Sequence, residues 1–588
     1  MARVAVDVPA LADQGRQFDY SVPARFADMV RIGTIVRVPL HGRRVGGWIV
    51  ELDVEPPAGV RVQALTGVTG HGPQPDLVEL SEWAAWRWSG RRTSMLRAAS
   101  PTGAVRHLPP PPDHGPPPGL PGEWAPVARE ALSRARAVVR LPPAADPMEL
   151  VGEIAQQRPT LVITPGVDSA RATATGLHRV GVPVALLPDG WARAAAGGRS
   201  VVGARGAAWG PAPGIGAVIV VDSHDGALVE ERAPTWSAWV VAAERARRLE
   251  VPCVLLSACP PVEQLAWGHL VVPSRAMERE GWSAMDVVDR RGADPRSGLL
   301  DERLVAALRS ARADRRTVVV LNRKGRVRLL SCRSCRSLVL CEHCDASMEE
   351  LVDEGLTCRR CGRSRPRLCQ QCGSGALRAV RSGVTRVGEE LAALARMAVG
   401  EVTADVGPLP PEPLLIGTEA VLNRFPAGGA TGVGCVVFLD FDAELLAPRF
   451  RAGEEALALL ARAARLVGGR SGRGTVVVQT RLPDHPVIQA ALRADPGRIV
   501  ADELALREEL RLPPAAALAE LSGDPARTAA LASALQGVPG VEVMGPTDGR
   551  WLVRASDHDV LCDALSVAGR PSGAEGSRLR VDVDPLRA

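Results

Sequence analysis

Lysine is almost absent from this sequence. Of its 71 lysine and arginine residues, only Lys324 is lysine. Proteins that hydrolyse nucleotides with a GxxxxGK[ST] phosphate loop need the lysine of that loop to contact the β and γ phosphates. Lys324 lies instead in NRKGR, so the sequence contains no such loop. ATP and Mg²⁺ are therefore not expected as cofactors, and we predict no ATPase activity.

Long apolar runs are missing as well. No stretch supplies the ~20 uncharged apolar residues that span a bilayer. The N-terminus MARVAVDVPALADQGRQFDY carries Arg3 and Asp7 and has no apolar core typical of a secretory signal. We expect a cytoplasmic protein with no membrane partner. Thiols stay reduced there, so the twelve cysteines indicate metal binding more than disulfides.

Size and composition indicate a folded chain of several domains. At roughly 100–200 residues per domain, 588 residues suggest several separate cores. The apolar fraction of 46% and the charged fraction of 23% are ordinary for globular chains and argue against disorder. The net charge of +5 permits DNA binding but does not require it.

Strand and helix patterns divide the chain into a multidomain α/β protein. Short β-like runs near the N-terminus predict a β-rich domain, and the prolines of HLPPPPDHGPPPGLPG predict a spacer. Apolar runs such as AVIVVD and TVVVLN alternate with helical segments, which indicates two lobes built on buried parallel sheets. The expected units are a β-rich domain at 1–106, a Pro-rich linker at 107–122, lobe 1 at 123–283, lobe 2 at 284–480 with an insertion at 330–375, and a small α+β domain at 481–588.

Four CxxC pairs fall within the insertion. A CxxC turn presents two thiolates to one ion, and two such turns complete the tetrahedral shell of a structural Zn²⁺. Iron–sulfur clusters also take four cysteines and are the chemical alternative. The pattern predicts two Zn²⁺ per chain, held by Cys332, Cys335, Cys341, Cys344, Cys358, Cys361, Cys369 and Cys372.

The two lobes and VGGRSGRG at 467–474 resemble the tandem lobes of superfamily-2 helicases. The resemblance implies that Arg470 and Arg473 face the nucleotide's terminal phosphates, although Leu466 replaces the family glutamine. Asp222 stands at the magnesium-binding position, but DSHD replaces the acidic motif that activates water. Prolines replace the glycines of the phosphate loop in AVVRLPPAADPMEL, and proline offers no N–H to a phosphate. The predicted nucleotide site is vestigial.

The order of these parts resembles the PriA family of primosomal replication restart proteins. The shared motifs are FDY near the N-terminus, an RVP strand, the CxxC pairs after NRKG, and a terminal DVDP. The resemblance implies nested pairing, with Cys332, Cys335, Cys369 and Cys372 on one zinc and Cys341, Cys344, Cys358 and Cys361 on the other. It also implies capture of a 3′ DNA end by Phe18, Asp19 and Tyr20 and by the loop at Gly42.

The eroded motifs are similar to those of a degenerate form found in high-GC actinobacteria. This likeness implies a protein at the nucleoid that recognises stalled or abandoned forks and promotes reloading of the replicative helicase without unwinding DNA. Its implied partners are forked and single-stranded DNA, primosome components, single-stranded DNA-binding protein and the replicative helicase. Two alternatives stay open: an active 3′-to-5′ helicase with an unconventional phosphate loop, and a zinc-ribbon transcription or RNA-binding factor.

Overall fold

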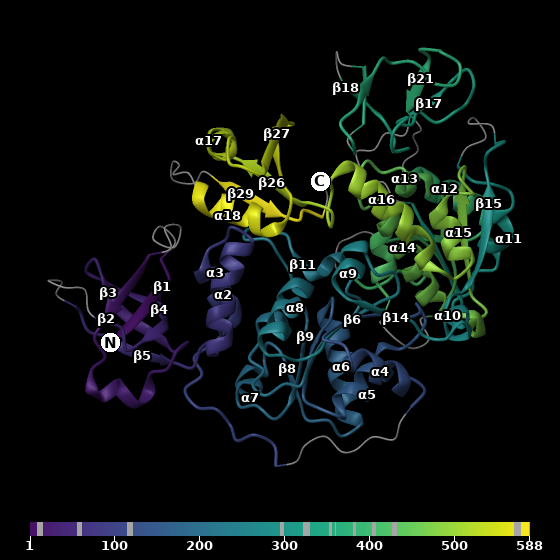
Figure 1. The fold of residues 1–588 in the computed structure, drawn as a ribbon. Helices are drawn as coiled ribbons and strands as arrows, with labels where there is room; N and C mark the ends of the chain where they lie inside the picture. Colours follow the sequence, from purple (N-terminus) through teal and green to yellow (C-terminus); the bar gives the residue numbers. More distant parts are fainter. Residues whose placement is uncertain are drawn as a thin grey trace.

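The chain folds into a series of α/β and β-rich units around two parallel sheets (Figure 1). The structure is a computed structural model. It describes residues 1–588 except 9–15, 56–61, 114–121, 294–298, 322–329, 352–354, 359, 380–383, 403–406, 426–431, 570–577 and 587–588. The NRKGR segment that contains Lys324 lies outside the described residues. Among the described helices, none is long and apolar enough to cross a membrane.

The N-terminal unit is an antiparallel sheet with the strand order β2-β1-β4-β3-β5. β3 and β4 form a hairpin in which Leu40 pairs with Arg43, so its turn consists of His41 and Gly42. Both turn residues have positive φ, as a two-residue turn of type I′ requires. The strands are β1 (Ala2–Val6), β2 (Gln17–Tyr20), β3 (Ile35–Leu40), β4 (Arg43–Leu52) and β5 (Gly67–Gly70).

Two helices follow this sheet, α2 (Pro75–Arg87) and α3 (Arg92–Ala99). Their apolar side chains belong to the same core as residues of lobe 1 and of the C-terminal domain, and Trp88 is only 1% exposed. In Figure 1 the helix pair stands between the N-terminal sheet, lobe 1 and the C-terminal domain. The helix pair therefore joins three units of the protein.

Lobe 1 is a parallel sheet with the order β14-β6-β13-β10-β7-β9-β8 and helices packed against it. Its strands are β6 (Arg136–Arg140), β7 (Thr160–Ile163), β8 (Val184–Leu186), β9 (Ser200–Gly203), β10 (Ala217–Val220), β13 (Cys253–Ser257) and β14 (His269–Val271). Its helices are α4 (Ala125–Leu132), α5 (Pro147–Ala155), α6 (Val167–Arg179), α7 (Trp191–Ala195), α8 (Ala238–Arg248), α9 (Val262–Trp267) and α10 (Arg275–Gly281). A short hairpin, β11 (Val229–Glu230) and β12 (Trp236–Ser237), precedes α8.

Lobe 2 is a second parallel sheet, with the order β15-β25-β24-β16-β23-β22. Its strands are β15 (Ala284–Asp289), β16 (Arg316–Val320), β22 (Val399–Val402), β23 (Leu414–Gly417), β24 (Val433–Phe438) and β25 (Thr475–Thr480). Its helices are α11 (Leu304–Arg309), α12 (Val384–Ala395), α13 (Asp442–Leu445), α14 (Ala452–Val467) and α15 (Pro486–Leu492), and α16 (Val500–Leu510) follows.

The cysteine-rich module projects from lobe 2 (Figure 1). It contains two small antiparallel sheets, formed by β17 (Leu330–Cys332) with β21 (Leu377–Ala379), and by β18 (Glu349–Leu351), β19 (Gly355–Thr357) and β20 (Ser364–Arg365). The C-terminal domain has the strand order β27-β28-β26-β29, from β26 (Ala517–Gly523), β27 (Val541–Thr547), β28 (Arg550–Ala555) and β29 (Leu579–Val583), with α17 (Pro525–Leu535) and α18 (His558–Ala568). The predicted fold class is confirmed.

Candidate metal centres, nucleotide cleft and DNA-end site

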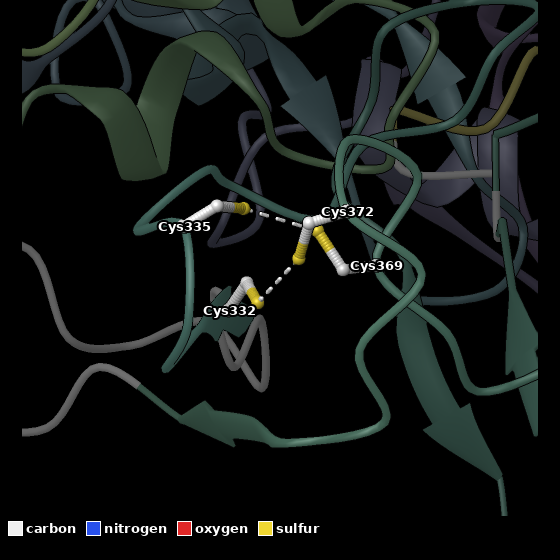
Figure 2. A group of neighbouring side chains, drawn as sticks. All are labelled: Cys332, Cys335, Cys369 and Cys372. Carbon is white, nitrogen blue, oxygen red and sulfur yellow. Dashed lines mark hydrogen bonds between the residues drawn. The ribbon is translucent and has the colours of Figure 1, made fainter.

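The eight cysteines of the module form two groups of four, each with its sulfur atoms within 4.8 Å of one another. In the first group, Cys332 and Cys335 come from one end of the module and Cys369 and Cys372 from the other. Figure 2 shows these four sulfurs turned towards a common centre, with Cys332 Sγ 3.6 Å from Cys372 Sγ and Cys335 Sγ 3.4 Å from Cys369 Sγ. The structure brings the cysteines together in the nested arrangement.

The second group unites the inner pairs. Cys341 Sγ lies 3.5 Å from Cys361 Sγ, and Cys344 Sγ lies 3.5 Å from Cys358 Sγ. A tetrahedron with Zn–S bonds of about 2.3 Å has S···S edges of about 3.8 Å. The sulfur separations in both groups are close to this edge, so each group could hold one tetrahedral metal ion.

All four CxxC turns share one backbone geometry. The N–H of the first cysteine donates to the carbonyl five residues later, and the residue four positions after that cysteine donates its N–H back to the cysteine carbonyl. The residue that donates this second hydrogen bond directly follows the second cysteine, and it has positive φ in every turn: Arg336, Asp345, Gly362 and Gly373. Backbone hydrogen bonds within each turn therefore fix the two cysteines relative to each other, whatever side chains stand between them.

The cleft between the lobes lies at the carboxyl ends of the lobe 1 strands, where open α/β sheets bind their ligands. Arg465, on α14 of lobe 2, donates from both Nη atoms to the Asp222 carboxylate, at 2.7 and 2.6 Å. Its Nε donates to the Pro143 carbonyl at 2.8 Å. Burial alone would raise the pKa of Asp222, but the Arg465 guanidinium outweighs it and lowers that pKa to about 2. One arginine thus contacts both Asp222 and the loop that follows β6.

That loop has little to offer a phosphate. The N–H groups of Leu141, Ala144 and Ala145 donate to the carbonyls of Ser257, Gly281 and Pro142. Pro142 and Pro143 have no N–H at all. A phosphate-binding loop needs several free N–H groups that point at its ligand. This loop therefore cannot bind a phosphate in that way.

Around Asp222 the remaining polar groups are also engaged. Arg462 Nη2 donates to Asp225 at 2.7 Å, and Ser257 Oγ lies 2.8 Å from His224 Nδ1 in a hydrogen bond. Burial lowers the pKa of His224, which keeps its ring neutral near pH 7. The space left is a cavity of about 30 Å³, room for a water molecule or two, lined by Asp222, His224, Asp225, Ala258, Ala461, Arg462 and Arg465.

Arg470 and Arg473 take positions apart from this cavity. Arg470 is exposed, and its Nε donates to the Arg279 carbonyl of α10 at 3.0 Å. Arg473 is exposed too, with φ of 52°. Of the described residues, the arginines that meet Asp222 and Asp225 are Arg465 and Arg462, which the motif comparison did not select. Their signal in the sequence is the i, i+3 spacing of two arginines within the apolar second half of α14, where Arg465 directly precedes Leu466.

The residues expected to capture a 3′ end lie on β2 and on the β3–β4 hairpin. Asp19 accepts from Arg3 Nε at 2.9 Å and is 14% exposed. Tyr20 is 3% exposed, and its hydroxyl donates to the Pro39 carbonyl at 3.1 Å. The Tyr20 ring belongs to the core of the sheet and offers no free face for base stacking. Phe18 is half-buried, and Gly42 is exposed at the hairpin tip.

Comparison with known proteins relates these features to one group. A family model described as 3′DNA-binding domain (3′BD) matches residues 3–101. The probable replication restart protein PriA of Mycobacterium leprae is 31% identical, covering 97% of this chain and 93% of that protein. The corresponding protein of Mycobacterium tuberculosis strain H37Rv is 32% identical over 91% of this chain and 89% of its own length. Replication restart protein PriA of Bacillus subtilis is 30% identical over 54% of this chain and 42% of that protein.

Proposed function

Because the chain belongs to the PriA family of replication restart proteins, we propose that it recognises stalled or abandoned forks and promotes reloading of the replicative helicase without unwinding DNA itself. The observation that supports the absence of unwinding is Arg465, whose guanidinium lies between Asp222, the residue expected to bind magnesium, and Pro143, in the segment that replaces the phosphate loop. A helicase needs that space for nucleotide hydrolysis. The active-helicase alternative has no support in this cleft.

The N-terminal sheet supplies the DNA end site in this proposal. The match of residues 3–101 to a 3′DNA-binding domain supports a role for Asp19 and the Gly42 turn. Asp19 accepts hydrogen bonds, as recognition of a 3′ hydroxyl requires, and Arg3 holds its carboxylate in place. Arg43 and Arg44, exposed beside Gly42, add positive charge where the phosphates of the strand would follow.

The cysteine groups hold zinc in a structural role. Four thiolates close the coordination shell and leave no position for a substrate, which is the arrangement of structural zinc sites. When bound, the ions would cross-link the two ends of a module whose small sheets have few core residues of their own. Single-stranded DNA-binding protein and the replicative helicase are the proposed protein partners, and the nucleoid is the proposed site of action.

Fork binding tests the proposal directly. We expect the purified protein to bind forks with a free 3′ hydroxyl more tightly than forks blocked there, and Asp19→Ala to abolish this difference. Glu51→Ala is the matched control, because Glu51 also pairs with Arg3 but is 53% exposed. Equal binding to both forks by the unaltered protein would refute the 3′-end role.

Phosphate release tests the second part of the proposal, that the protein does not hydrolyse ATP to unwind DNA. We expect DNA-stimulated ATP hydrolysis to stay at the level of buffer for the protein and for its Asp222→Asn variant. Turnover by the unaltered protein that Asp222→Asn abolishes would establish a motor and overturn the scaffold proposal. Zinc determination with two ions per chain completes the test, and iron in place of zinc would reject the metal assignment.

A further inference from the structure

We propose that Arg462 and Arg465 act as a built-in substitute for nucleotide that holds the two lobes permanently closed. In a two-lobe motor the bound nucleotide bridges the lobes, and closure comes and goes with it. In this chain the bridge is covalently part of lobe 2. The inference concerns the conformation of the lobes and goes beyond the proposed loss of hydrolysis.

The contacts across the mouth of the cleft carry the inference. Arg465 is bidentate on Asp222 and also reaches Pro143, so one side chain fixes two different segments of lobe 1. Arg462 is paired with Asp225 one helical turn away, at 2.7 Å. Bidentate arginine–carboxylate pairs are geometrically specific and strong for a hydrogen-bonded ion pair. The bidentate Arg465–Asp222 pair and the single Arg462–Asp225 contact lie side by side on α14, and together they fix both the distance and the rotation between the lobes.

Further direct contacts between the two lobes lie on the outer side of the cleft. The Ser471 N–H donates to Glu280 Oε1 at 2.8 Å, and Arg470 reaches the Arg279 carbonyl. Gly469 lies so close to Glu280 that an added Cβ would stand 2.1 Å from its carbonyl oxygen. The helicase-type motif at 467–474 therefore packs directly on α10 of lobe 1, through the Ser471 N–H, the Arg470 side chain and the close approach of Gly469.

A second charged cluster closes the far end of the interface. Arg507 of α16 bonds to Glu263 of lobe 1 at 2.7 Å and to Glu454 of lobe 2 at 2.5 Å. Glu454 also accepts from the Val262 N–H at 2.7 Å, directly across the lobes. Arg451 approaches Glu263 at 2.9 Å. The lobes are thus joined by charge pairs at both ends of α14.

These contacts make closure independent of any ligand. A nucleotide that bridges two lobes stabilises the closed state only as far as its concentration exceeds its dissociation constant. Side chains of the same chain have no such dependence. If the protein binds forks as proposed, the surface that it presents to DNA and to partners is the same at every ATP level.

Hydrogen exchange of the free protein tests the inference without DNA. In Arg462→Gln/Arg465→Gln we expect exchange in peptides covering residues 141–146 and 258–262 to be at least ~10-fold faster, with strands β10 and β24 unchanged. The double variant Asp222→Asn/Asp225→Asn, which removes the same pairs from lobe 1, is expected to give the same result. Asp225→Asn keeps the side-chain oxygen that accepts from the Ala227 N–H.

The matched control is Arg247→Gln/Arg248→Gln. Both arginines pair with Glu244 inside helix α8, and Arg248 also lies 4.0 Å from Glu79 of α2, so arginine–carboxylate contacts are lost without a change between the lobes. We expect exchange at the cleft to stay as in the unaltered protein, and addition of MgATP to the unaltered protein to have no effect on it.

Three results would overturn the inference: unchanged cleft exchange in both cleft variants, faster exchange that spreads equally into β10 and β24, or slower cleft exchange when MgATP is added. The second result would show that the arginines maintain the fold of the lobes rather than their contact. Absence of fork binding would refute the proposed function, whereas the exchange pattern decides lobe closure by itself.

Discussion

Replacement of Arg507 by methionine is the most demanding test of the charge network between the lobes. The Arg507 side chain is 1% exposed and meets three carboxylates, those of Glu263, Glu454 and Glu503. It also donates to the Pro513 carbonyl at 2.9 Å. Methionine retains much of the side-chain volume, but the three carboxylates stay buried without the positive charge of Arg507. Removal of one partner from a buried ion pair typically costs about 3–5 kcal/mol, and we expect a loss in this range near pH 8.

The loss depends on pH through Glu454. Burial, together with the nearby Glu263 carboxylate, raises the pKa of Glu454 to about 7 from a usual value of 4.5. A raised folded-state pKa contributes stability that is fully present below about 4.5 and is lost as the pH rises through about 7. Without Arg507 the carboxyl pKa values rise further, at about 1.4 kcal/mol per pKa unit. The variant should therefore be less impaired near pH 5.5 than near pH 8 by about 1–3 kcal/mol.

Calorimetry at both pH values measures the effect. At roughly 2–4 °C per kcal/mol for a unit of lobe size, a loss of about 3–5 kcal/mol should lower the transition temperature by about 6–20 °C near pH 8. Arg511→Met is the matched control, since Arg511 directly follows the last residue of α16 and its pair with Glu542 is 57% and 43% exposed. Such exposed pairs contribute about 0–1 kcal/mol. An Arg507→Met variant no less stable than Arg511→Met, or one equally impaired at both pH values, would refute the reasoning.

Two further predictions concern the cysteine module and the C-terminal domain. Cys372 is exposed, whereas the cysteines of the second group are mostly buried. A chelator should therefore remove one zinc per chain well before the other, and the Cys372→Ser variant should retain one zinc per chain. Simultaneous loss of both ions would contradict two separate sites. Asp584 accepts from Arg87 at 2.6 Å and from His558 at 2.8 Å, so Asp584→Asn should speed proteolytic release of the C-terminal domain about 10-fold, and an unchanged rate would exclude this contact as its anchor.

Most of the fold could be predicted from local sequence patterns. Apolar runs such as those at 217–222 and 475–480 are β10 and β25, because strands buried on both faces require uninterrupted apolar residues. The four CxxC turns were predictable for a similar reason, since each is fixed by its own backbone hydrogen bonds. The absence of a conventional phosphate loop followed from composition alone.

The arginines of the cleft could not be located in this way. Arg465 contacts Asp222 and Pro143, which are more than 240 residues away in sequence, and no local pattern encodes such a contact. Motif comparison selected Arg470 because the family places a ligand opposite it, whereas here α10 lies there. Tyr20 shows the same limit: a strand residue faces the core or the solvent according to register, which FDY alone does not specify.

The helix pair α2–α3 bears on how this protein can be divided. Leu77, Leu80, Trp88 and Met95 are at most 1% exposed and share their core with lobe 1 and the C-terminal domain. A fragment cut at the proline-rich segment would leave those side chains in water, an apolar patch of the kind that drives aggregation. The segment of residues 1–106 is therefore not expected to fold as an independent unit, and substitutions in these helices must be accommodated by three domains at once.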